Sequence, residues 1–186
     1  AKVDKLQENA GFYLDELQKK AVVESVCNGV FILTGGPGTG KTTTINAIIR
    51  YFESEGLDFY LAAPTGRAAK RMTETTGYEA KTLHRLLELN GRSGEDSSFK
   101  AGFERNEDNP IEADVVIVDE MSMVDILIAS RLFSAIPSDC KVVIVGDSDQ
   151  IPSVSPGEVL SDLIKTKEIT TIRLNEIHRQ AKDSSI

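Results

Sequence analysis

The chain has 186 residues, of which 40% are hydrophobic, and carries a formal net charge of −8. This size and composition suit a single α/β domain with a sizeable core, and the acidic balance argues against a surface that coats nucleic acid. No signal peptide is visible, and the apolar runs are far too short to span a bilayer. We therefore expect a cytoplasmic protein without membrane contact, in which Cys27 and Cys140 are ordinary reduced thiols.

The first half of the chain predicts helices that alternate with strands. A helical lead-in over about 1–28 contains a helix from Asp15 to Cys27, which ends at the favoured stop signal Asn28-Gly29. Further on, Pro64-Thr65 opens an amphipathic helix that Gly77 ends. The expected elements are a strand at 30–34, a helix at 41–55, a strand at 59–63, a helix at 65–75 and a short helix near 83–89.

The second half continues this pattern after a polar segment at 90–110, which we interpret as a loop or small excursion. Its β-branched runs predict strands buried on both faces, and strands alternating with helices predict a parallel sheet between two helical layers. Ser155 and Glu158 form a capping box that predicts a helix start at Pro156. The expected elements are strands at 114–119, 141–146 and 170–174 and helices at 125–134 and 156–166.

Residues 35–42 fit G-x-x-x-x-G-K-[ST], the phosphate-binding loop of nucleotide hydrolases. They lie between a predicted strand and a predicted helix. We expect Lys41 to reach the β- and γ-phosphates of a nucleotide and the Thr42 hydroxyl to hold Mg²⁺. The alternative is a glycine-rich turn that binds nothing. The expected nucleotide-binding residues are Gly36, Pro37, Gly38, Thr39, Gly40, Lys41, Thr42 and Thr43.

Two other predicted strands end in polar residues, and parallel strands place ligands at their carboxyl ends. Asp119 is expected to hold the metal and Glu120 to activate water as a general base. Gln150 follows the next strand, where it could bond the γ-phosphate and the attacking water. The alternatives are that the acids merely begin a solvated loop and that the segment before Gln150 is a plain turn.

The chain resembles the RecD-like 5′→3′ DNA helicases of superfamily 1, which include the alpha chain of exodeoxyribonuclease V. The resemblance runs from about Leu14 to Gln180 and implies a three-layer RecA-like P-loop domain that uses ATP and Mg²⁺. Pif1-like helicases share part of the pattern. The segments that resemble helicase motifs I, Ia, II, III and IV are residues 35–42, 63–69, 119–125, 146–154 and 174–180.

The resemblance also implies roles for single residues, each beside a simpler alternative. Gln18 matches a glutamine that contacts adenine, yet it also completes a capping box with Asp15. Arg179 matches an arginine that approaches the γ-phosphate, yet it could form a surface pair with Glu176. Four positions match residues near single-stranded DNA, although a threonine there also suits a helix cap and the histidine could pack locally. They are Thr65, Arg67, Thr82 and His84.

Charge is unevenly distributed along the chain. Residues 66–92 carry six Lys or Arg against three Glu, whereas residues 104–125 carry eight acids and one Arg. A basic strip on an acidic body permits a confined nucleic-acid track, although charge alone decides nothing.

The chain ends at Ile186 without counterparts of helicase motifs V and VI. We therefore expect the first motor domain of a longer DNA helicase, with a second RecA-like domain as its partner on single-stranded DNA and recombination-nuclease subunits as candidate partners. The alternatives are a Pif1-like helicase domain and a nucleotide-dependent switch that binds protein.

Overall fold

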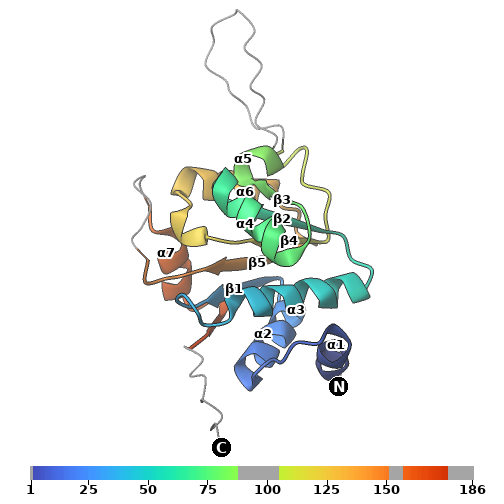
Figure 1. The fold of residues 1–186 in the computed structure, drawn as a ribbon. Helices are drawn as coiled ribbons and strands as arrows, with labels where there is room; N and C mark the ends of the chain where they lie inside the picture. The colour runs from blue at the N-terminus through green and yellow to red at the C-terminus, as the bar shows by residue number, and fades with distance from the viewer. Residues whose placement is uncertain (1, 88–104, 151–156, 176–186) are drawn as a thin grey trace, which may run out of the picture.

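The computed structural model describes residues 2–87, 105–150 and 157–175. Its centre is a six-stranded sheet in the order β3-β2-β4-β5-β1-β6, in which every neighbouring pair is parallel (Figure 1). The predicted parallel sheet is therefore confirmed. The strands are β1 Val30–Thr34, β2 Phe59–Ala63, β3 Ala80–Thr82, β4 Val115–Val118, β5 Lys141–Gly146 and β6 Thr170–Arg173.

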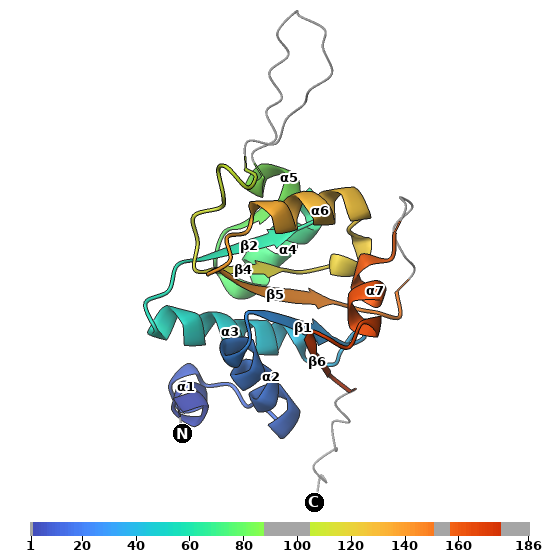
Figure 2. The same ribbon diagram turned by 180° about the vertical axis from the view of Figure 1, so that it is seen from behind.

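Helices cover both faces of the sheet, as predicted for a three-layer domain. Val115 and Ile117 of β4 pack with the helices on one face, whereas Val116 and Val118 pack on the other, because successive side chains of a strand point to opposite sides. Figures 1 and 2, drawn from opposite sides, show α4 and α6 on opposite faces. The helices are α1 Lys2–Ala10, α2 Glu16–Cys27, α3 Lys41–Ser54, α4 Gly66–Thr76, α5 Leu83–Leu86, the 3₁₀ turn η1 Met121–Met123, α6 Ile126–Ala135 and α7 Val159–Lys165.

The capping signals predicted for α2 and α4 form in the structure. The Asp15 carboxylate accepts a hydrogen bond from the Gln18 N–H at 2.8 Å, and the Gln18 side chain accepts one from the Asp15 N–H at 3.0 Å, so the capping box is present. Thr65 caps α4, and Gly77 ends it with a φ of 78°. These local bonds satisfy N–H groups that a helix start leaves free.

The predicted start of α7 at Pro156 is wrong. The helix begins at Val159, and Glu158 is its N-cap without a side-chain hydrogen bond; Ser155 and Pro156 lie outside the described residues. The reason is Gly157, whose φ of 110° is not helical. The backbone of Gly157 lies close to Ile126 of α6, because a Cβ at Gly157 would meet Ile126 at 3.0 Å. The helix therefore begins only after this close contact.

The remaining differences are at short elements. Helix α1 and strand β3 were not predicted as separate elements, and α5 ends at Leu86, with residues 88–104 outside the described part. Both cysteines are free thiols. Within the described ranges, no helix has the length and apolar character needed to cross a membrane.

Candidate functional site

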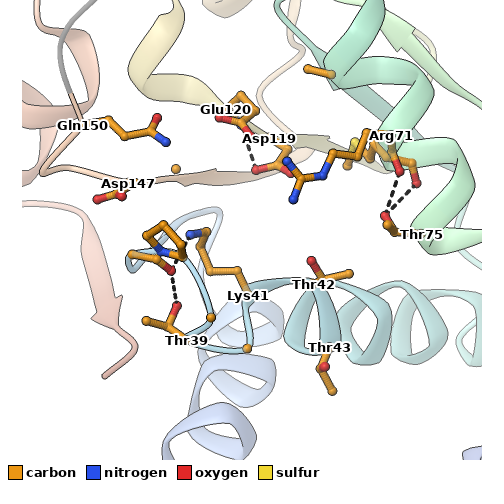
Figure 3. A pocket seen from close by; sticks show the side chains of 17 residues that line it. Thr39, Lys41, Thr42, Thr43, Arg71, Thr75, Asp119, Glu120, Asp147 and Gln150 are labelled. Carbon is orange, nitrogen blue, oxygen red and sulfur yellow. Dashed lines mark hydrogen bonds between the residues drawn. The ribbon is translucent and has the colours of Figure 1, made fainter. Parts of the chain in front are cut away.

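The carboxyl ends of β1, β4 and β5 meet at one edge of the sheet, since all neighbouring strands are parallel. A pocket of about 710 Å³ opens there between the loop after β1 and the facing ends of β4, β5 and α4 (Figure 3). It is lined by Gly36, Pro37, Gly38, Thr39, Gly40, Lys41, Thr42, Thr43, Ala68, Arg71, Met72, Thr75, Asp119, Glu120, Gly146, Asp147 and Gln150.

The loop after β1 is shaped by its own backbone. Gly38 and Gly40 have φ values of 73° and 87°, a left-handed conformation that glycine adopts without a steric penalty. The buried Thr39 hydroxyl donates to the Gly36 carbonyl at 2.8 Å and braces the turn from inside. Thr34 accepts from the Ser148 N–H at 3.2 Å, which fixes the start of the loop to the segment after β5. The loop is thus held in the form expected of a phosphate cradle.

Lys41 lies at the first turn of α3 with its ammonium group inside the loop (Figure 3). It donates to the carbonyl of Gly35 and, at 3.0 Å, to that of Gly36. An ammonium group has three protons, so one remains for a ligand in the pocket. These two bonds hold the charge beneath the space that the loop encloses.

The Gln18 side chain is only 2% exposed, so its polar atoms must find hydrogen-bond partners within the protein, and it has two. Its side-chain oxygen accepts from Asp15 in the capping box, while its amide nitrogen donates to the Gly40 carbonyl at 3.2 Å. The capping alternative is therefore confirmed, together with a link from α2 to the end of the phosphate loop. One amide proton remains, and the adenine contact stays a prediction.

Asp119 directly follows β4 and faces the pocket. Burial raises the pKa of its carboxyl above the ordinary value of 3.8, and the Glu120 charge adds to this effect. The Glu120 N–H bond to the Asp119 carboxylate, 2.7 Å long, and the charges of Lys41 and Arg71 oppose it. Perturbed carboxylates beside cations are common at functional sites, and the metal-binding role of Asp119 stays a prediction.

Glu120 has a φ of 54° and a ψ of 37°, which is left-handed backbone in a residue other than glycine. Such a conformation costs roughly 1–2 kcal/mol. Lys167 has a similar φ of 58° just after α7, where a left-handed residue commonly closes a helix. Glu120 instead separates a buried strand from a 3₁₀ turn, so its strain lies at a residue that lines the pocket, as strained residues at functional sites commonly do.

The residues present fit a Mg²⁺ ion. The Thr42 hydroxyl and the Asp119 carboxylate come from different elements and face the same space in Figure 3. Mg²⁺ prefers oxygen ligands and is typically held by one or two carboxylates together with substrate phosphates. Thr43 also lines the pocket, but its side chain lies on the far side of α3 from Asp119 (Figure 3).

Gln150 reaches the pocket from the turn after β5. Its side-chain oxygen accepts from the Ser122 hydroxyl at 2.9 Å, which leaves the amide N–H groups for a ligand. Sequence reasoning missed this role of Ser122, since the spacing of 28 residues between the two carries no signal. Arg179 and residues 151–154 of the expected third motif lie outside the described residues.

Helix α4 supplies a wall of the pocket that the sequence analysis did not assign. Ala68, Arg71, Met72 and Thr75 line the pocket, and Met72 is at the same time buried in the core beside Ala69. Spacings of three and four residues place the first group on one face, so helical periodicity was the available signal. That periodicity predicts which residues share one face of the helix, but it does not predict which part of the protein this face lies against.

The four expected DNA positions lie at the same edge of the sheet, beside the pocket. Ala63 of β2 pairs with Thr82 of β3, which brings the starts of α4 and α5 together. Thr65 and Thr82 each accept a backbone N–H and cap these helices, at 3.1 and 3.2 Å. The capping alternative is confirmed for Thr65, whereas the cap at Thr82 was not predicted. Arg67 and His84 are exposed. Their DNA contacts stay predictions.

Comparison with known proteins agrees with this geometry. The AAA domain family matches residues 18–156. The ATP-dependent RecD2 DNA helicase of Deinococcus radiodurans is 39% identical over 173 residues, which are 93% of this chain and 23% of that protein. The chain belongs to the AAA domain family and is a RecD-like superfamily 1 motor domain.

The chain is also similar to another RecD protein and, in fold, to a Pif1 structure. The RecBCD enzyme subunit RecD of Mycolicibacterium smegmatis is 36% identical over 179 residues, 84% of this chain and 31% of that protein. The crystal structure of Bacteroides sp. Pif1 with ADP-AlF4 superposes with a TM-score of 0.61 at 26% identity, covering 91% of this chain and 43% of that one. The domain spans less than a third of the length of these two curated relatives.

Proposed function

We propose that this domain binds and hydrolyses ATP as the first motor domain of a DNA helicase. The observation that carries the proposal is the convergence of Lys41, Asp119 and the strained Glu120 in one pocket at the edge of the sheet. A cation beneath a backbone cradle with two carboxylates opposite is the arrangement that phosphoryl transfer to water requires.

Each side chain has a part that its position supports. Lys41 donates its remaining proton to the phosphates, and the loop N–H groups surround them. Thr42 and Asp119 hold Mg²⁺, which when bound neutralises phosphate charge. Glu120 takes a proton from the water that attacks the γ-phosphorus, as the bond to the β–γ bridging oxygen breaks.

Three further residues have roles in this proposal. The Gln150 amide donates to the γ-phosphate or to the water, in the orientation that Ser122 supports. Arg179 neutralises charge that develops during transfer, and Gln18 contacts the adenine. Both of these roles rest on the resemblance of their segments to helicase motifs.

The DNA track runs over the starts of α4 and α5. Thr65, Arg67, Thr82 and His84 contact the phosphates of single-stranded DNA without reading its sequence, since hydroxyls, helix N-termini and cations are suited to phosphate. The finer proposal is 5′→3′ translocation in cytoplasmic DNA recombination and repair. The names of the RecD relatives make the alpha subunit of exodeoxyribonuclease V one candidate, with further nuclease-complex subunits as partners.

The test is phosphate release by a full-length protein that contains this domain, with and without single-stranded DNA. We expect stimulation by DNA of any sequence that weakens as salt rises, because phosphate contacts release counterions. Arg67→Ala should raise the DNA concentration needed for all sequences alike, whereas Lys165→Ala, an exposed cation on α7, should not. Hydrolysis that DNA leaves unchanged would instead favour a nucleotide-dependent switch that binds protein.

A further inference from the structure

Among the described residues that line the pocket, Arg71 is the one arginine, and none of the helicase-like motifs includes it. It projects from the second turn of α4, and Figure 3 shows its guanidinium group reaching toward Asp119, across from the phosphate loop. With respect to the described residues, this group donates no hydrogen bond and has no carboxylate within ion-pair distance. The guanidinium of this exposed arginine therefore has donors available to a ligand in the pocket, although its charge also acts on the nearby Asp119 carboxylate.

The neighbours of Arg71 on α4 indicate that this placement is built. Met72 is 3% exposed and Ala69 is 5% exposed, and they fasten the helix to the core. The Asn46 side chain of α3 donates to the Thr75 carbonyl at 3.2 Å, which joins α4 directly to the helix that follows the phosphate loop. The backbone beneath Arg71 is thus fixed relative to Lys41 and Thr42.

The ligand chemistry follows from the position of the charge. Lys41 lies beneath the loop, and Arg71 lies across the pocket from it, so the two cations flank the space between the cradle and Asp119. A planar guanidinium matches two oxygens of one phosphate group and remains charged at all relevant pH values. A nucleoside triphosphate presents its terminal phosphate in this space, whereas a diphosphate leaves the outermost position empty.

We propose that Arg71 binds the terminal phosphate of the nucleoside triphosphate and so connects α4 to the state of the nucleotide. This inference rests on the proposed ATP site and deepens it. Arg67 lies one turn earlier on the same helix, roughly 6 Å along its axis, and the N-cap Thr65 lies roughly 9 Å away, from a rise of 1.5 Å per residue. A contact that exists only before hydrolysis therefore acts next to the proposed DNA track.

The experiment is titration calorimetry of the 186-residue chain with Mg²⁺ and either ADP or the non-hydrolysable β,γ-imido analogue of ATP. The wild type should bind the analogue more tightly than ADP. Arg71→Ala should reduce this preference about tenfold or more and leave ADP affinity unchanged, because a charge-assisted bond to phosphate is lost. Arg71→Lys should keep part of the preference, since charge remains but the planar fork does not.

Lys70→Ala is the matched control, because Lys70 is a neighbouring exposed cation on α4 that does not line the pocket. It should leave both affinities unchanged. Thermal melting of each variant shows that it is folded. An unchanged preference for the triphosphate in folded Arg71→Ala, or an equal loss of that preference in Lys70→Ala, would overturn the proposed role of Arg71 but not the proposed ATP site. Failure of the wild type to bind either nucleotide would overturn the proposed site as well.

Discussion

The two sides of the pocket are built in different ways. The phosphate loop is made by backbone: left-handed glycines, carbonyls that hold Lys41, and a hydroxyl brace within the turn. The facing wall is made by side chains from three separate elements, namely α4, the end of β4 and the turn after β5. The loop is suited to holding phosphates in any state, while the wall contains the groups that we propose to act on the phosphates or to respond to their hydrolysis.

The largest expected effect is on the wall, at Glu120. Glu120→Gln in a full-length protein should lower turnover by about 10²–10⁴-fold, the usual contribution of a general base, because it removes the base and preserves its shape. Binding of Mg²⁺–ATP should remain within a few-fold of wild type. Single-turnover phosphate release and calorimetry measure the two quantities, and Glu112→Gln serves as an exposed control. Comparable turnover in Glu120→Gln and wild type would refute the base assignment.

A smaller effect distinguishes the backbone of the loop from that of the wall. Gly38→Ala should lower the free energy of unfolding by about 1 kcal/mol, because its φ of 73° strains an L-residue although a Cβ there would meet nothing within 4 Å. Gly66→Ala at the start of α4 has equal space without the left-handed φ, and it should be neutral or stabilising. Urea unfolding compares them, and equal free energies would contradict a loop shaped by its glycines.

The smallest expected effect is a pH dependence at Asp119. Burial raises its pKa in the folded state, so the folded protein binds more protons than the unfolded one above pH 3.8 and loses stability as pH rises toward the folded pKa. Asp119→Asn keeps an oxygen for the Glu120 N–H and removes this cost. Without metal or nucleotide, its melting temperature should exceed that of wild type at pH 7.

The advantage of Asp119→Asn should shrink as pH falls below the ordinary aspartate value, where the wild-type carboxyl is protonated in both states. A melting temperature equal to or below that of wild type at pH 7 would show that burial of this carboxylate carries no cost.

The difference between the two sides also explains what the sequence predicted. The loop was evident because its backbone requires glycines at fixed spacing next to Lys41 and Thr42. Asp119 and Glu120 were evident because they end an uninterrupted apolar strand. Arg71 was not evident. Helical periodicity predicts which residues share one face of α4, but only the packing of Met72 and Ala69 against the core turns that face toward the pocket.

Other results depended on contacts that are distant in sequence. Gln18 serves a local cap and a distant carbonyl with one amide, and only the structure gives the second partner. Helix α7 begins later than predicted because the backbone of Gly157 lies against α6, about 30 residues earlier in the chain. Ser122 and Gln150 meet because parallel strands bring their ends together. Local patterns predict elements, whereas these pairs arise from the order of strands in the sheet.

The most direct test of the central claim, a triphosphate site organised around Lys41, is calorimetric titration of this chain with Mg²⁺–ATP at a temperature where hydrolysis is slow. We predict one measurable site in the wild type. Lys41→Ala should weaken it by at least about tenfold, because the cation beneath the phosphates is lost. Equal affinity in the wild type and in a folded Lys41→Ala variant would contradict the account.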